Sequence, residues 1–109
     1  MAAEIELADR AHKALLAIER RWTREHGSAD NPLLAEIQHA TSRLREMPEL
    51  GRVCGRDRHG REIRQILLHL DWHLYYTHRR ALNVITILSV RYARRGTRPG
   101  FLQRGDRDS

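Results

Sequence analysis

Val84-Ile85-Thr86-Ile87-Leu88-Ser89-Val90 is the stretch of this 109-residue chain that decides its fold. β-Branched residues dominate the stretch, and apolar side chains occupy both of its alternating faces, which is typical of a strand covered on two sides. Because two-sided cover is found inside a sheet, we predict a central strand over Leu82–Tyr92. Helices should cover one of its faces, and the other should be partly covered.

Turn-forming residues divide the region before this strand into further short strands. They recur at Gly55, at His59-Gly60, near Asp71 and between Thr77 and Ala81. Residues of these types end strands where hairpins follow one another closely. The predicted strands are Arg52–Gly55, Glu62–Leu68 and Trp72–Thr77.

Two amphipathic helices are predicted in the first half of the chain. Apolar residues recur at three- and four-residue spacing from Ala11 to Trp22, with Asp9 expected as the N-cap residue and an end near Gly27. Asp30-Asn31-Pro32 should cap a second helix, because proline at the first helical position loses no hydrogen bond. That helix should continue until Pro48 stops it, and the two should form an antiparallel hairpin with a shared apolar face.

These elements define an α+β fold. Ile5 and Leu7 alternate with Glu4 and Glu6, which indicates a short N-terminal strand before the helices. The predicted architecture is an N-terminal strand and a helix hairpin packed on a small, mainly antiparallel, twisted sheet of four to five strands. We expect residues 1–95 to form one domain and residues 96–109 to be a flexible basic tail, pinned at most by Phe101 and Leu102.

Composition restricts the classes of protein. Hydrophobic residues make up 40% of the chain and charged residues 31%, which favours a packed core over disorder. The N-terminus lacks a signal-like order and no apolar run could span a membrane, so we expect a cytoplasmic protein that does not bind a membrane. Cys54 is the single cysteine and no ligand cluster is evident, so no metal site and no cofactor are expected.

The positive charge is unevenly distributed along the chain. The net charge is +6, but residues 1–50 hold seven Lys and Arg against nine Asp and Glu, whereas residues 51–109 hold 13 Arg against five. The second half should therefore attract an acidic partner, although a Coulomb argument does not separate DNA, RNA and acidic protein.

Several local motifs resemble those of the ParE/RelE toxin superfamily, over about residues 3–100. They are the helix run from Ala11 to Trp22, the turn Pro48-Glu49-Leu50-Gly51, the strand pair Ile63-Arg64 and Leu74-Tyr75-Tyr76, and the closing run Ile87-Leu88-Ser89-Val90-Arg91-Tyr92-Ala93-Arg94-Arg95. Their order and spacing are more specific than any single motif. The resemblance implies the toxin of a bacterial type II toxin–antitoxin system.

The superfamily implies two activities with different chemistry. ParE-like members inhibit DNA gyrase by binding, whereas RelE-like members cut messenger RNA in the ribosomal A site. The lysine pair of one RelE-like subgroup is absent, because no lysine follows Lys13, and Pro99 or Phe101 stands where a late tyrosine would be useful. We therefore favour a gyrase inhibitor without catalysis, with the endoribonuclease as the alternative and a non-toxic interaction module with a toxin fold as a third possibility.

The candidate residues follow from this resemblance, and no catalytic residue is assigned. Arg64 matches the arginine of the middle strand, and Arg94 or Arg95 could complete a phosphate clamp with it. The target-contact candidates are Arg64, Arg91, Tyr92, Arg94 and Arg95. The antitoxin-contact candidates are Trp22, Leu15, Arg61 and Arg98.

The remaining aromatic and imidazole side chains are interpreted as structural. His69, His73 and His78 should not share a face, so surface or partly buried positions are favoured over a catalytic role. Tyr75 and Tyr76 should face opposite sides of their strand, which places at least one in the core, and Trp72 should cap the sheet edge.

An antitoxin is the expected partner, in a hetero-oligomer with this chain. It should carry a DNA-binding N-terminal part and an acidic or amphipathic C-terminal segment that folds on the toxin. The expected landing surface is the groove between the helix hairpin and the sheet, with the basic strand ends.

Overall fold

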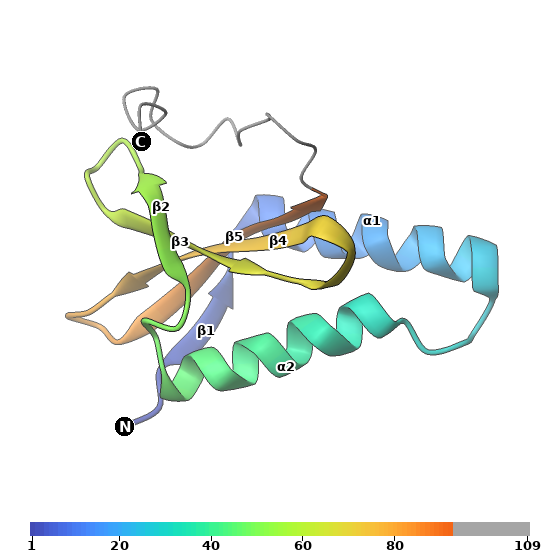
Figure 1. The fold of residues 1–109 in the computed structure, drawn as a ribbon, viewed down its shortest axis with the longest axis horizontal. Coiled ribbons are helices and arrows are strands. Elements are labelled where there is room, and N and C mark those ends of the chain that lie inside the picture. The colour runs from blue at the N-terminus through green and yellow to red at the C-terminus, as the bar shows by residue number, and fades with distance from the viewer. Residues whose placement is uncertain (93–109) are drawn as a thin grey trace.

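The computed structural model describes residues 1–92 and forms one sheet with two helices on one of its faces (Figure 1). The elements are β1 (Glu4–Leu7), α1 (Asp9–His26), α2 (Pro32–Glu46), β2 (Arg52–Arg56), β3 (Glu62–Leu67), the short 3-10 helix η1 (His69–Asp71), β4 (Trp72–Arg79) and β5 (Val84–Tyr92). The predicted order of elements and the α+β class are confirmed. The predicted tail, residues 96–109 with Arg98, lies outside the described residues, as do Arg94 and Arg95 at the end of the predicted domain.

The sheet has five strands in the order β1-β5-β4-β3-β2. β5 pairs with β1 in parallel and with β4 in antiparallel orientation, so it is an interior strand, as its two apolar faces predicted. The other neighbouring pairs are antiparallel. A sheet that is mainly antiparallel is therefore confirmed, with the β1–β5 pair as its parallel exception.

The turn between β4 and β5 lies later in the chain than predicted, so β5 also starts later. β4 continues to Arg79 and β5 begins at Val84, whereas Thr77 and Leu82 were the expected limits. Asn83 adopts a positive φ of 52°, which is incompatible with an extended strand. Asp71, with a φ of 65°, similarly marks the predicted break between β3 and β4.

The second helix starts as the sequence predicted, but the first does not. The Asn31 side chain accepts hydrogen bonds from the backbone N–H groups of Leu33 (3.0 Å) and Leu34 (3.4 Å), and Pro32 is the first helical residue. In α1, Asp9 is the first helical residue and Ala8 is the N-cap residue, without a side-chain cap. Ala8 donates its N–H to the Ile87 carbonyl (2.9 Å), so pairing with β5 fixes the helix start one residue early.

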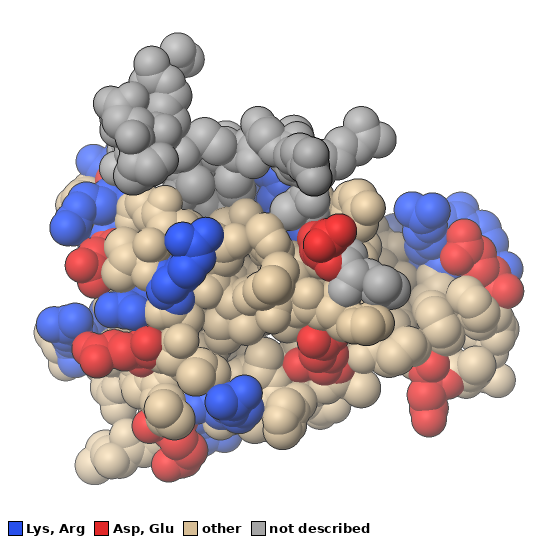
Figure 2. All heavy atoms as spheres, viewed as in Figure 1, with Lys and Arg blue, Asp and Glu red and all other residues tan. Residues whose placement is uncertain are grey.

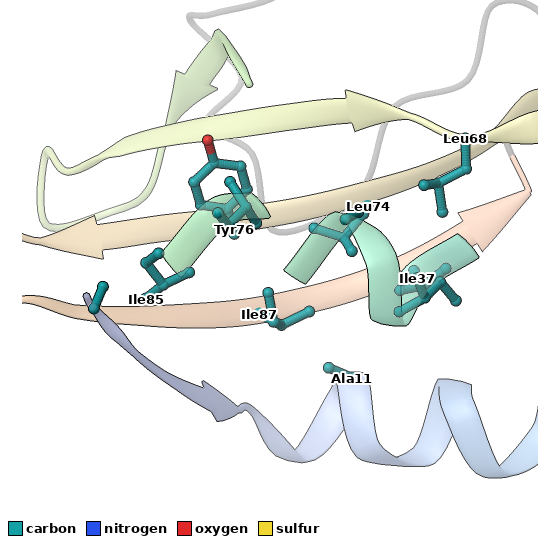
Figure 3. Close-up of a cluster of buried hydrophobic side chains, with 11 residues drawn as sticks. Ala11, Ile37, Leu68, Leu74, Tyr76, Ile85 and Ile87 are labelled. Atoms are coloured by element: carbon teal, nitrogen blue, oxygen red, sulfur yellow. The ribbon is translucent and has the colours of Figure 1, made fainter. Parts of the chain in front are cut away.

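Both helices pack against the same sheet residues. Ala11 of α1 and Ile37, Ala40 and Leu44 of α2 join a buried cluster with Leu74, Tyr76, Ile85 and Ile87 (Figure 3). We call this the inner face of the sheet, and the opposite side the outer face. Within the described residues, no helix is long and apolar enough to cross a membrane.

Candidate functional site

Strand pairing assigns the candidate residues to opposite faces of the sheet. Arg64 pairs with Tyr76, and Tyr76 pairs with Ile87, so Arg64 belongs to the inner face. Leu67 pairs with His73, and His73 with Arg91, three residues further along β3 and β4. Because successive residues of a strand alternate between faces, Arg91 belongs to the outer face. Arg64 and Arg91, two of the target-contact candidates, therefore lie on opposite faces of the sheet.

Arg64 holds the turn that connects α2 with the sheet. Its guanidinium donates hydrogen bonds to the carbonyls of Gly51 (2.6 Å) and Glu49 (3.3 Å), and Glu62 lies 3.7 Å from the same group. A guanidinium engaged in this way has fewer donors left for a phosphate. The interactions of Arg64 are those of a structural residue.

Tyr76 fixes the same turn from inside the core. Its hydroxyl donates to the Pro48 carbonyl and accepts from the Gly51 N–H, both at 2.8 Å, and the side chain is fully buried. A Cβ atom on Gly51 would lie 2.8 Å from the Gln65 carbonyl oxygen and 2.9 Å from the Tyr76 ring. Glycine is required here because strand and phenol approach the backbone too closely for a side chain. The Pro48–Gly51 motif therefore has a packing origin.

The outer face carries a polar cluster that the sequence did not single out. We define the outer-face cluster as Arg52, Gln65, His73, Tyr75 and Arg91. Arg52 pairs with Gln65 and Gln65 with Tyr75, while His73 pairs with Arg91, so the five residues occupy neighbouring positions on four strands. Directly opposed residues lie about 5 Å apart at Cβ, within reach of one another.

His73 is the centre of this cluster. Its Nδ1 atom lies 2.8 Å from the Gln65 amide nitrogen and 3.2 Å from the Tyr75 hydroxyl oxygen. The amide nitrogen can only donate, so Nδ1 accepts and the neutral ring carries its proton on Nε2. Burial, together with the positive charges of Arg52 and Arg91, lowers the pKa of His73 from 6.5, although Asp71 opposes the shift. At neutral pH the cluster offers a neutral imidazole beside two guanidinium groups, a combination suited to an anionic group.

A groove lies between the two helices and the end of the sheet. It has a volume of about 900 Å³. Its lining residues are Ala17, Ile18, Arg21, Trp22, Glu25, Asn31, Pro32, Leu33, Glu36, His69, Trp72 and Tyr92. We call this cavity the groove. It separates the C-terminal half of α1 from the N-terminal half of α2, so the predicted helix hairpin shares a sheet face but is open at this end.

Aromatic side chains form the apolar part of the groove. Trp72 and Tyr92 meet edge to face with their ring centres 5.9 Å apart. Trp22 stacks on His26 with centres 3.7 Å apart and donates from Nε1 to the Ala29 carbonyl (2.7 Å). These contacts fix the rings, so the aromatic surface is formed before a partner arrives.

The antitoxin-contact candidates are dispersed. Trp22 lines the groove, whereas Leu15 packs against the core. Arg61 lies between β2 and β3, where it pairs with Asp57 at 3.0 Å. Hydrogen bonds from Arg61 and His59, with the charge of Arg61, outweigh burial and lower the pKa of Asp57. Tyr92, a target-contact candidate, lines the groove instead.

His69, His73 and His78 do not share a face, as predicted. His69 lines the groove and His73 belongs to the outer-face cluster. The His78 Nε2 atom lies 3.0 Å from the Asn83 side-chain oxygen. Within residues 1–92, no group of three or more His, Cys, Asp and Glu side chains is placed to hold a metal ion.

Hairpin geometry was the signal that could have revealed the outer-face cluster. The pairing of β3 with β4 is symmetric about residue 70, from Arg64 with Tyr76 to Leu67 with His73. A tight turn near Asp71 was predicted, and folding the two strands about it would have placed Gln65 opposite Tyr75. The hairpin of β2 and β3 would then have placed Arg52 opposite Gln65.

The chain matches a protein-family model and is similar in fold to a solved structure. The family model described as the ParE toxin of the type II toxin–antitoxin system parDE matches residues 5–96. The chain is similar in structure to a double arginine-to-alanine mutant of the E. coli toxin RelE in the free state, with a TM-score of 0.59, 15% identity and 88% of each chain covered. That likeness concerns the fold alone. No curated protein sequence matches the chain.

Proposed function

Because the chain belongs to the ParE toxin family of type II toxin–antitoxin systems, we propose that it inhibits DNA gyrase by binding, without catalysing a reaction. The observation that carries this proposal is the extent of the family match, which begins within β1 and includes both helices and the other four strands. Gyrase inhibition is the activity that the ParE-like subgroup implies. Two of the described target-contact candidates are arginines. Arg64 fixes the α2–β2 turn, whereas Arg91 lies on the outer face and does not contact that turn.

A supercoiling assay tests this function directly. Purified gyrase, relaxed plasmid and ATP are incubated with increasing amounts of the chain, and supercoiling should fall in proportion to the bound toxin. Arg91→Gln should require more toxin for the same inhibition. Arg43→Gln, at the exposed end of α2, is a control with the same change in charge. Unchanged supercoiling at a large excess of toxin would remove the proposal.

We propose the groove as the binding site for the antitoxin. An apolar cavity lined by two tryptophans and a tyrosine, with Arg21, Glu25 and Glu36 around it, suits the apolar face of an amphipathic helix. Aromatic rings that are already fixed lose little conformational entropy on binding, so they contribute strongly to affinity. Occupation of the groove would also cover Trp72 and Tyr92, which adjoin His73 and Arg91 along their strands.

Truncation of Tyr92 tests the groove. The Tyr92 side chain is 52% exposed, so Tyr92→Ala should preserve the fold. Loss of an aromatic anchor costs about 2 kcal/mol or more, so the dissociation constant for the antitoxin should rise about 30-fold. Leu82→Ala, at a position 64% exposed in the β4–β5 turn, is the matched control for loss of apolar surface. Equal affinities of the two variants, measured by calorimetry, would place the antitoxin elsewhere.

The outer-face cluster favours a second candidate function, cleavage of messenger RNA. In this reaction the 2′-hydroxyl gives up its proton to a general base and attacks the adjacent phosphorus, the bond from phosphorus to the 5′-oxygen breaks, and that oxygen takes up a proton. In this candidate function Arg52 and Arg91 would balance the charge that develops on the phosphate, and His73, whose Nδ1 accepts a hydrogen bond from Gln65, would donate the Nε2 proton to the leaving oxygen. Arg64 is not part of this assignment, because it fixes the α2–β2 turn.

Primer extension on translated messages separates the two functions. A nuclease would produce cuts in phase with codons only when ribosomes are present, and His73→Ala would abolish them. His69→Ala is the control, since His69 lies in η1 beside the groove. Intact messages together with inhibited gyrase would exclude the nuclease.

A further inference from the structure

Helix α1 carries a row of basic side chains on one exposed side. At about 100° per residue, Arg10, Lys13, Arg20 and Arg24 fall within an arc of about 80° around the helix axis. All four are exposed. We call these four residues the basic stripe. Figure 2 shows Lys and Arg side chains, with acidic side chains beside them, over the end of α1 at the right of the view.

The stripe is uniform in charge. The only other residue of α1 within the arc is Ala17, while Asp9 stands at the N-terminal margin and Glu19 and Glu25 lie outside it. Among the described residues, no ion pair joins Lys13, Arg20 or Arg24 to a carboxylate. Arg21, beside the stripe, pairs with Glu25 at the groove. Lys13, Arg20 and Arg24 are therefore not neutralised by an ion pair within the described residues.

The stripe is not evident from charge counts along the chain. Residues 1–50 carry more acidic than basic side chains, so the basic character was assigned to the second half. Helical geometry places the four stripe residues within one arc, whereas the three carboxylates of α1 lie outside that arc. None of the four stripe residues lines the groove, although Ala17, within the same arc, does.

From this arrangement we propose that the basic stripe binds the phosphate backbone of double-stranded DNA without reading its sequence. The distance from Arg10 to Arg24 along the axis is about 21 Å, since each residue rises 1.5 Å. That length follows roughly six base pairs of backbone at 3.4 Å per pair. A straight, rigid row of cations matches the regular row of phosphates on a stiff duplex.

Other partners fit the stripe less well. Protein interfaces need buried apolar or aromatic anchors, and the arc contains only Ala17 besides the cations. Binding of single-stranded nucleic acid needs aromatic rings on which bases stack, and the arc has none. Phosphate contacts require only cations, which is what the stripe supplies. This binding goes beyond inhibition of gyrase and does not require that enzyme.

The test is salt-dependent binding of the full chain, freed of antitoxin, to a labelled 30-base-pair duplex measured by anisotropy. The triple variant Lys13→Gln, Arg20→Gln and Arg24→Gln is compared with a control triple, Arg43→Gln, Arg58→Gln and Arg80→Gln. The control removes the same charge from exposed positions outside the stripe. Helical circular dichroism verifies that both variants fold.

The stripe variant should bind at least about tenfold more weakly than wild type and the control triple at low salt. The slope of log affinity against log salt should fall by about 2.7, or about 0.9 for each lost phosphate contact. Equal weakening by both triples would mean that net charge alone acts, and would overturn the proposal. Tighter binding of a matching RNA hairpin or of an acidic peptide, lost in the same variant, would overturn DNA as the ligand. Since gyrase is absent, failure here is distinct from failure of gyrase inhibition.

Discussion

Removal of one oxygen atom, in Tyr76→Phe, should cost the fold much of its stability. The hydroxyl is the only group of Tyr76 that the change removes, and it joins the Pro48 carbonyl and the Gly51 N–H at 2.8 Å each. The ring remains in the core beside Leu74 and Ile85, so apolar packing is preserved. The loss therefore reports on the turn between α2 and β2.

The magnitude follows from the two hydrogen bonds. Each contributes about 1 kcal/mol net, and a buried donor left without an acceptor costs about 1–3 kcal/mol. Because the Gly51 N–H lies in a buried hydrogen bond, we expect a loss of about 2–4 kcal/mol. With an unfolding entropy of about 2.1 cal/mol/K per residue, 109 residues give a fall in Tm of roughly 4 °C per kcal/mol. Tyr76→Phe should therefore melt roughly 8–16 °C lower.

Thermal and urea denaturation followed by circular dichroism measure this loss. Tyr92→Phe is the matched control, because its hydroxyl belongs to a side chain that is 52% exposed, and its stability should stay within about 0.5 kcal/mol of wild type. A loss below about 1 kcal/mol in Tyr76→Phe, or equal losses in both variants, would refute the idea that this hydroxyl fixes the turn.

Three further predictions concern the same turn and the outer-face cluster. Gly51→Ala should destabilise by about 2–3 kcal/mol in urea denaturation, because its Cβ would meet the Gln65 carbonyl at 2.8 Å, and an unchanged midpoint would contradict this contact. Arg64→Ala should lower the Tm but leave gyrase inhibition per folded molecule unchanged, and a specific loss of inhibition at constant stability would restore Arg64 as a target contact. Since the folded pKa of His73 is lowered, its contribution to stability is complete above pH 6.5 and is lost as pH falls through the folded pKa. Wild type should thus lose more stability than His73→Gln between about pH 7 and pH 5 in urea titrations, and parallel losses would contradict the shift.

The fold could be predicted because its signals are local. The apolar run of β5, the cap at Asn31 and the breaks near Asp71 and Gly60 each depend on a few neighbouring residues. Alternation also placed one of Tyr75 and Tyr76 in the core. Asp9 was misassigned as a cap because a hydrogen bond from Ala8 to distant Ile87, rather than a local cap, fixes the helix start.

The candidate site could not be predicted to the same extent, because it depends on which strands pair and in which register. Arg64 was proposed as a target contact from its place on the middle strand, but a guanidinium can bind a phosphate or a backbone carbonyl equally well. Only the tertiary structure places the Gly51 carbonyl 2.6 Å away. His73 likewise contacts Gln65 of the neighbouring strand and Tyr75 of its own strand, and the contact with Gln65 depends on the register of β3 and β4.

A single irregularity in β5 determines how the end of the sheet is used. Tyr75 pairs with Ser89 but Tyr76 pairs with Ile87, so Leu88 is an extra residue in the strand. Strict alternation from Ile87 would place Arg91 on the inner face and Tyr92 on the outer one. The bulge exchanges them, so that Tyr92 lines the groove and Arg91 joins His73 on the outer face. Consecutive residues thereby serve two surfaces, and a partner held at Tyr92 lies one residue away from the guanidinium that we propose contacts the target.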